Sequence, residues 1–311
     1  MALLDTVDPT GLDEFSVVFT DRSLNHMSAE FQQVMRDLSD WLGEVYNADA
    51  MAFAPAPIEE VTAAIREGKP QVVFAPHVET SSGMILPDDY IKEMAAAAHE
   101  VGALMVLDCI ASGCVWVDMK ALGVDVLISA PQKGWSASPS AGLVMMSARA
   151  EARLNETTSD SFAIDLRKWR DIMKAYEAGG HAYHATMPTD ALRLFRDTVK
   201  ETRDYGFDRL KEAQWRLGEA VRQALAARGV TSVAADGFAA PGVVVGYTAD
   251  PDVQNGKAFA AHGMQIAAGV PLQVGEPDDF RTFRLGLFGL DKLYDVDATV
   301  ARLTAVLDEV L

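Results

Sequence analysis

The sequence predicts an α/β protein whose strands form a mostly parallel sheet. Three apolar runs, at residues 71–77, 103–109 and 124–130, are continuous and do not alternate with polar residues. Continuous runs are typical of strands covered on both faces by helices. Helical segments at residues 57–69 and 86–102 precede the first two runs, and this alternation indicates a doubly wound fold.

Local signals define the elements of this first part. Residues 28–46 carry apolar side chains at helical spacing, and Ser28 can cap the helix. Pro57 stands near the start of the next helix, and Gly102 closes the one after it. A short helix and a further strand are predicted at residues 118–123 and 142–147.

The chain changes character after residue 188, where long helices precede a group of short strands. Helices are predicted at residues 188–205, 207–228 and 296–311, and short strands at 230–235, 242–247, 264–269 and 282–288. Elements on this scale make a smaller α+β domain. We therefore predict a division into an N-terminal segment with the start of the large domain, the large domain itself and a small domain, at residues 1–50, 51–205 and 206–311.

Composition excludes several classes of protein. With 49% hydrophobic and 23% charged residues, the 311-residue chain has the make-up of a soluble globular protein. Its net charge of −18 argues against nucleic acid or an anionic membrane as a partner. Cys109 and Cys114 give neither a metal-binding spacing nor a disulfide framework, and the N-terminus has no signal-peptide pattern. We expect a cytoplasmic protein that does not span a membrane.

Two polar residues at strand ends are the main candidates for chemistry. Asp108 ends one predicted strand, and Lys133 follows the next. The carboxyl ends of strands in one open sheet point into the same crevice. A lysine that holds an aldehyde, and an aspartate that keeps a pyridine nitrogen protonated, are what pyridoxal phosphate chemistry needs. Taken singly, each has an ordinary interpretation, as a solvated loop lysine and a helix-capping aspartate.

Other polar residues allow both a functional and a structural interpretation. His77 follows a third strand, where its ring could stack on a planar cofactor or make an ordinary loop hydrogen bond, and Thr80 supplies a nearby hydroxyl. Tyr183 and Thr186 precede a predicted helix start, which suits a phosphate or is a simple cap. Arg284 lies between apolar neighbours and needs a carboxylate or phosphate, supplied by a ligand or by an internal salt bridge.

The glycines exclude two nucleotide-binding motifs. The sequence has no GxGxxG pattern and no GxxxxGK[ST] pattern in a suitable context. Neither a Rossmann dinucleotide site nor a P-loop is therefore predicted.

Together these segments resemble the class V aminotransferases, which belong to the fold type I pyridoxal phosphate enzymes. Within that family, the chain is most similar to the alanine–glyoxylate and serine–glyoxylate branch. The resemblance runs from about Ser28 to the end of the chain. It rests on five segments in family order, namely HVETSSG, LDCIAS, SAPQKGW, YHATMP and FRLGLFG.

The resemblance implies roles around the cofactor ring. Lys133 would form the internal aldimine with pyridoxal phosphate and move a proton during the reaction. Asp108 would pair with the pyridine nitrogen, and Ile110 would pack on one ring face. His77, or Thr80 just after it, would lie near the ring and its 3-hydroxyl.

It also implies roles at the phosphate and the substrate. Gln132 would contact the phosphate of the cofactor. Tyr183 and Thr186 would reach the phosphate of the neighbouring subunit in a homodimer. Arg284 would bind the α-carboxylate of the substrate.

The sequence departs from the family pattern in two places. Ala130 and Pro131 replace a glycine and a serine before the lysine, so one phosphate-binding hydroxyl is expected to be lost. Between Ala50 and Met51 the family has several dozen more residues, including a glycine-rich phosphate turn and an aromatic residue that stacks on the ring. Either these residues belong to the protein and are missing from this sequence, or the deletion is real and cofactor binding is weak or lost. Because so large a deletion would expose an apolar face, the first alternative is favoured.

These observations predict transamination between a small amino acid, alanine or serine, and a 2-oxo acid, glyoxylate or pyruvate. One alternative is a lyase or cysteine desulfurase of the same fold, although no cysteine follows Cys114 to act as the mobile nucleophile. Another is a non-catalytic homologue that keeps the fold and has lost the cofactor.

Overall fold

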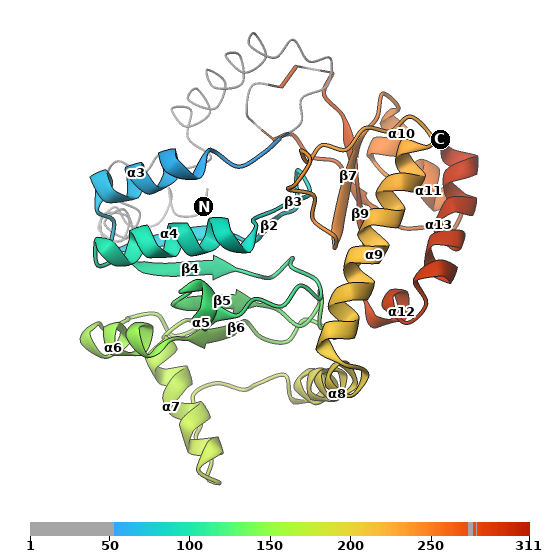
Figure 1. The fold of residues 1–311 in the computed structure, drawn as a ribbon. Helices are drawn as coiled ribbons and strands as arrows, with labels where there is room; N and C mark the ends of the chain where they lie inside the picture. Colours follow the sequence, from blue (N-terminus) through green and yellow to red (C-terminus); the bar gives the residue numbers. More distant parts are fainter. Residues whose placement is uncertain (1–52, 273–275, 278) are drawn as a thin grey trace.

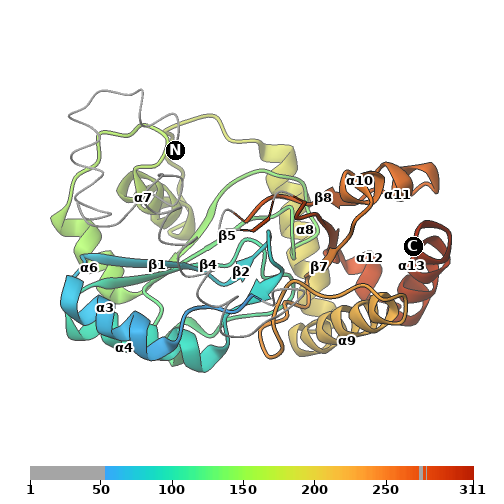
Figure 2. The ribbon, with the colours of Figure 1, turned by 90° about the horizontal axis from the view of Figure 1, so that it is seen from above.

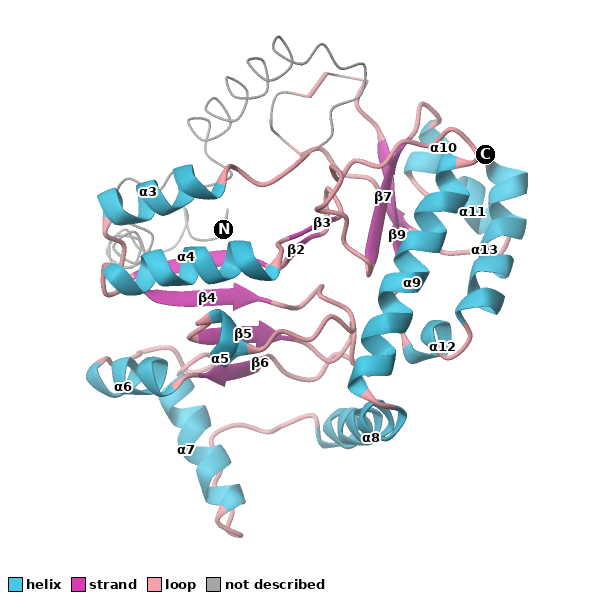
Figure 3. Ribbon diagram, in the orientation of Figure 1, coloured by secondary structure: helices cyan, strands magenta, loops and turns pink. Residues whose placement is uncertain are grey.

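The computed structural model describes residues 53–272, 276–277 and 279–311. The predicted helix at residues 28–46 and the junction of Ala50 with Met51 lie outside the described residues. The described part contains a larger sheet beside helices α3 and α4, and a smaller sheet beside helix α9 (Figure 1). Figure 3 shows the same arrangement with helices and strands coloured separately.

The larger sheet has the strand order β1-β4-β5-β6. Strands β1 (Val72–Pro76), β4 (Leu104–Asp108) and β5 (Val126–Ser129) run parallel, and β6 (Leu143–Met146) is antiparallel to β5. The mostly parallel α/β sheet is therefore confirmed. Its three parallel strands place their carboxyl ends along one edge.

Helices cover one face of this sheet. Helices α3 (Ile58–Gly68) and α4 (Asp88–Glu100) lie on it, and the short helix α5 (Met119–Leu122) packs beside α4 (Figure 2). On the opposite face Phe74 of β1 is 54% exposed. The expected cover on both faces is thus only partial in the part of the chain that the structure describes.

The smaller sheet is antiparallel, with β9 (Thr282–Gly286) between β7 (Val243–Tyr247) and β8 (Ala267–Ala268). Its apolar core packs against α9 (Phe207–Ala226) and α13 (Val296–Val310). The prediction of a strand at 230–235 was wrong, because this segment forms only isolated bridges. Gly229, directly before the segment, and Gly237, two residues after it, have positive φ, so the chain turns on either side of a short stretch. Short helices complete this part: α10 (Pro251–Gln254), α11 (Lys257–Ala261) and α12 (Leu290–Leu293).

Three further segments complete the described part of the chain. A hairpin of β2 (Val78–Glu79) and β3 (Met84–Ile85) follows β1, and Ile85 N donates a hydrogen bond to Phe238 O at 2.8 Å. Helices α6 (Ala148–Glu156) and α7 (Leu166–Glu177), which the sequence analysis did not predict, follow β6 and are capped by Ser147 and Asp165. Helix α8 (Thr189–Tyr205) then leads into α9. The division into domains at residue 205 stays a prediction.

Candidate active site

The carboxyl edge of the larger sheet gathers three of the predicted site residues. Asp108 is the last residue of β4, His77 directly follows β1, and Lys133 lies on the turn after β5. His77 N donates a hydrogen bond to Asp108 O at 2.8 Å, which extends the pairing of β1 and β4 by one step. Parallel strands thus bring residues from distant parts of the sequence to one edge.

Asp108 is half-buried at the end of its strand. It pairs with Pro76 and Ile128, so its side chain belongs to the row on the same face as Phe74, the partly covered one. Its Oδ1 accepts a hydrogen bond from Ile110 N at 2.9 Å. This local bond orients the carboxylate, and among the described residues its second oxygen accepts no hydrogen bond.

His77 is buried, with 1% of its surface exposed. Its Nδ1 lies 2.7 Å from Ser112 Oγ, on the loop after β4, and 3.9 Å from Cys109 Sγ. Burial lowers the pKa of His77 to about 4, and the positive charge of Lys211 acts in the same direction. The ring is therefore neutral at pH 7 and supports the loop that follows Asp108.

Lys133 is half-buried on a tight turn. The turn is closed by hydrogen bonds from Ser136 N to Lys133 O and from Ala137 N to Pro131 O, each 3.0 Å long. The Lys133 Nζ lies 5.4 Å from the centre of the Phe288 ring. Among the described residues, no carboxylate lies within ion-pair distance of this amine, so it is free to react with a ligand.

Two glycines hold the loops after β4 and β5 together. A Cβ atom at Gly134 would lie 2.1 Å from Gly113 O, far inside contact distance. Gly113 itself has a φ of +65°, and a Cβ there would lie 2.7 Å from Gln214 Oε1. Only glycine permits this approach of backbones, which keeps the Lys133 turn against the loop that follows Asp108.

The remaining predicted residues lie on several different elements. Thr80 is half-buried in the turn between β2 and β3, Ile110 is half-buried after β4, and Gln132 is exposed beside Lys133. Arg284, in the middle of β9, donates from Nε to Ala268 O at 2.7 Å.

Tyr183 and Thr186 lie on the connection between α7 and α8, and the Tyr183 hydroxyl is 3.2 Å from Thr186 Oγ1. Tyr183 is 79% exposed, so this pair faces solvent. Among the described residues, none covers these two side chains as a cofactor site would.

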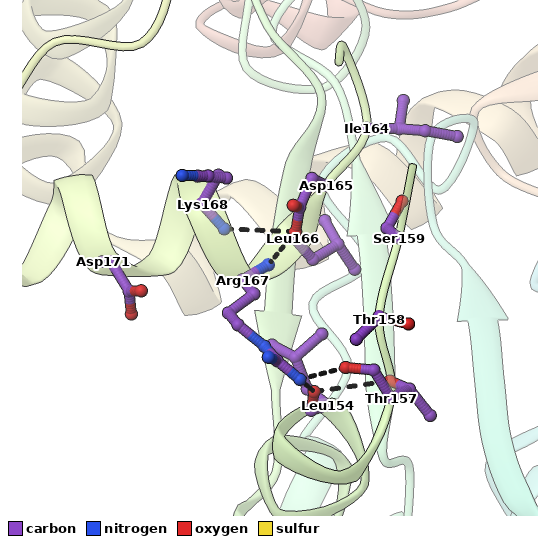
Figure 4. Close-up of a pocket in the computed structure, with 10 residues that line it drawn as sticks. All are labelled: Leu154, Thr157, Thr158, Ser159, Ile164, Asp165, Leu166, Arg167, Lys168 and Asp171. Atoms are coloured by element: carbon purple, nitrogen blue, oxygen red, sulfur yellow. Dashed lines mark hydrogen bonds between the residues drawn. The ribbon is translucent and has the colours of Figure 1, made fainter. Parts of the chain in front are cut away.

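A separate cavity of about 420 Å³ lies between α6 and α7 (Figure 4). Arg167, on its wall, donates hydrogen bonds to Leu154 O and to neighbouring carbonyls at the end of α6. These bonds satisfy a helix end, and the cavity contains none of the predicted site residues.

Sequence reasoning missed three residues that shape the site. Phe288 lies over the Lys133 amine, Ser112 holds His77, and Gly113 touches the lysine turn. Gly134, which follows Lys133, could have indicated in the sequence that another backbone approaches closely there. The other two contacts depend on tertiary structure.

Among the described residues, no helix is long and apolar enough to cross a membrane. These residues also contain no group of three or more His, Cys, Asp or Glu side chains able to hold a metal ion.

Comparison with known proteins gives the family. The family model for class V aminotransferases matches residues 46–244. The alanine–glyoxylate aminotransferase 1 of Saccharomyces cerevisiae is 28% identical over 76% of this chain and 63% of its own length. A protein of Synechococcus sp., named as the small subunit of a soluble hydrogenase, is 27% identical over 78% of this chain and 61% of its own length. The chain therefore spans little more than three fifths of these two relatives.

A solved structure shows the same fold. The alanine–glyoxylate aminotransferase of Nostoc sp. matches with a TM-score of 0.71 and 22% identity, over 88% of this chain and 71% of that one. The chain belongs to the class V aminotransferase family, with the fold of the type I pyridoxal phosphate enzymes. Membership indicates pyridoxal phosphate as the cofactor.

The residues present fit that cofactor. The Lys133 amine, which has no ionic partner in the described part of the chain, can take the aldehyde. The half-buried Asp108 carboxylate, whose second oxygen accepts no hydrogen bond there, can take the pyridinium N–H. Both stand at the carboxyl edge of the sheet, where small ligands bind in open α/β folds.

The burial of His77 predicts a pH-dependent stability. Its pKa is about 4 in the folded protein against 6.5 as the ordinary value, so between these pH values only the unfolded chain binds the proton. The free energy of unfolding should therefore fall as the pH drops from about 6.5 to 4, by up to about 3 kcal/mol. Urea unfolding at a series of pH values measures it. His77→Asn should flatten this part of the profile, whereas His181→Gln, at an exposed position, should leave it unchanged.

Because Gly134 lies against Gly113, we expect one added methyl group at position 134 to lower both stability and activity. Gly134→Ala should displace the Lys133 turn, lower the free energy of unfolding by about 1–3 kcal/mol and cut turnover roughly 100-fold. Gly142→Ala is the matched control, since a Cβ there meets no atom within 4 Å. Equal behaviour of the two variants in thermal unfolding and in transamination assays would show that the glycine contact is not needed.

Proposed function

We propose that this protein is a pyridoxal phosphate-dependent aminotransferase. It would transfer an amino group between a small amino acid, alanine or serine, and a 2-oxo acid, glyoxylate or pyruvate. The observation that carries the proposal is the unpaired Lys133 amine on the turn next to the strand that ends in Asp108. The named relatives in yeast and Nostoc sp. support this class of substrate.

When bound, pyridoxal phosphate supplies an electron sink for negative charge at the substrate Cα. Lys133 Nζ would hold the aldehyde of the resting enzyme and, once released as a free amine, carry a proton away from the substrate Cα. Asp108 would keep the proton on the pyridine nitrogen. Ile110 and Thr80 would line the ring, and His77 would support the loop beneath it.

Arg284 would select substrates that carry a carboxylate. Its Nε is committed to Ala268 O, which fixes the plane of the guanidinium on β9. The terminal N–H groups remain for a two-point grip on the α-carboxylate. Gln132 would contact the phosphate at the other end of the site.

We also propose a homodimer in which α7 faces a second copy. In the part of the chain that the structure describes, α7 has no buried residue. Two of its large apolar side chains, Met173 and Tyr176, are 58% and 56% exposed. Phe162 and Ile164, just before it, are 66% and 71% exposed. Exposed apolar side chains gathered in this way favour a protein partner. Tyr183 and Thr186, which follow α7, would then reach the phosphate in the neighbouring subunit.

A cysteine desulfurase is less consistent with the site. Cys109 and Cys114 are both buried, and burial raises the pKa of each thiol to about 12. A thiol that stays protonated is a poor nucleophile. The two free thiols, with no disulfide between them, support the proposed cytoplasmic location.

Lys133→Ala decides between an enzyme and a cofactor-free homologue. Wild-type protein mixed with pyridoxal phosphate should develop the visible absorption of lysine-bound cofactor and transaminate alanine or serine. The variant should do neither, because it lacks the amine that would take the aldehyde, while its circular dichroism stays unchanged. Lys120→Ala, on the exposed helix α5, should behave as wild type. A wild-type protein that takes up no cofactor would favour the non-catalytic alternative.

Arg284→Lys tests the carboxylate site. Lysine keeps the charge but loses the planar grip, so the KM for the amino acid should rise about tenfold or more while cofactor affinity stays the same. Arg281→Lys, three residues earlier, is the matched control. An unchanged KM, or a loss of cofactor instead, would mean that Arg284 serves the sheet alone.

Met173→Glu tests the dimer. A charge in an apolar interface is costly to bury, so the variant should sediment as a monomer where the wild type sediments as a dimer. Trp215→Glu, at an exposed aromatic position on α9, should remain dimeric. If both variants keep the wild-type mass in ultracentrifugation, the α7 surface is not the interface.

A further inference from the structure

The lysine turn is fastened to the segment that follows β9. Leu290 N donates a hydrogen bond to Ser136 Oγ at 2.8 Å, across 154 residues of sequence. Two residues earlier, the Phe288 ring lies 5.4 Å from Lys133 Nζ. A Cβ atom at Gly242 would lie 3.1 Å from this ring, so the backbone of Gly242 supports it closely.

Ser136 adopts an unusual backbone conformation. Its φ is +59°, and Lys69 is the other non-glycine residue with positive φ among the described residues. Lys69 ends helix α3, where a left-handed residue is common. Ser136 lies in a loop, where this conformation persists only if its surroundings hold it. Here, the bond from Ser136 N to Lys133 O and the bond from Leu290 N provide that restraint.

We propose that Phe288 and Ser136 are positioning residues for Lys133. The face of the Phe288 ring attracts the charged amine and holds it whenever it is not bound to cofactor. Ser136 locks the turn to Leu290 in the segment after β9, six residues beyond Arg284, so that the amine and the substrate-binding strand keep a fixed spacing. The inference rests on the proposed function and adds two residues to it.

Substitutions at positions 288 and 136 can remove the proposed interaction while keeping the size or the backbone conformation of the residue. An aliphatic side chain at position 288 would fill similar space without the electron-rich face. Glycine at position 136 would accept the φ of +59° but could not accept the hydrogen bond from Leu290 N, whereas asparagine tolerates this conformation and carries an acceptor. These differences separate positioning from general packing.

The experiment measures how fast the cofactor is trapped on the lysine, without substrate or turnover. Cofactor-free protein is mixed with pyridoxal phosphate, reduced with borohydride at set times, and digested, and the labelled Lys133 peptide is counted by mass spectrometry. Phe288→Leu should slow labelling by roughly two- to fivefold, and Phe288→Tyr should restore it. Ser136→Gly should slow labelling, and Ser136→Asn should restore it.

Matched controls come from the same chain. Phe280→Leu alters a half-buried ring at the opposite end of β9, where it packs on Tyr247. Ser138→Gly alters an exposed serine two residues beyond Ser136. Both controls should label at the wild-type rate.

The outcomes separate the two proposals. Wild-type protein that labels no lysine overturns the proposed function. If folded Phe288→Leu and Ser136→Gly label Lys133 at the wild-type rate, this inference is wrong and the proposed function stands. If Phe288→Leu fails to fold by circular dichroism, the Ser136 pair decides: slowing in glycine with rescue by asparagine supports the inference, and equal rates refute it.

Discussion

The contact between the backbones of Gly113 and Gly134 is the constraint on which the site depends. Hydrogen bonds of the parallel sheet bring the ends of β4 and β5 to one edge, but they do not fix the loops beyond those ends. Gly134 does so because it lacks the Cβ atom that would meet Gly113 O, and Gly113 lacks the Cβ atom that would meet Gln214. Gln214, fully buried on α9, extends the contact, because its Oε1 meets Gly113 and its Nε2 donates to Pro241 O at 3.1 Å. One point of close packing thus joins both sheets behind the lysine.

Much of this arrangement could be predicted because it depends on local sequence. Continuous apolar runs located β1, β4 and β5, and the polar residues at their ends followed from the rule for open parallel sheets. The segment at 230–235 failed as a strand although it is apolar, since glycine turns outweigh strand propensity there. Helices α6 and α7 were missed because their faces are mainly polar, and their caps at Ser147 and Asp165 were the usable signal.

The contacts within the site could not be predicted in the same way. Ser136 and Leu290 are 154 residues apart, and nothing in either local sequence announces their hydrogen bond. Phe288 belongs to a segment recognised for Arg284, yet its position over Lys133 depends on how β9 turns after Gly286. Burial of His77 depends likewise on Ser112, on another strand's loop. Sequence patterns locate residues on elements, whereas such pairs are set by the packing of one element on another.

The replacement of two family residues before the lysine gains a physical explanation. Pro131 is buried, and its carbonyl accepts the hydrogen bond from Ala137 N that closes the turn. A proline with fixed φ stiffens this turn, which the hydrogen bond from Leu290 N to Ser136 Oγ also restrains. The hydroxyl lost at this position would have served the phosphate, not the lysine. Under the proposed function, this turn would place the amine, while Gln132 and the Tyr183 and Thr186 of a second copy would contribute contacts to the phosphate.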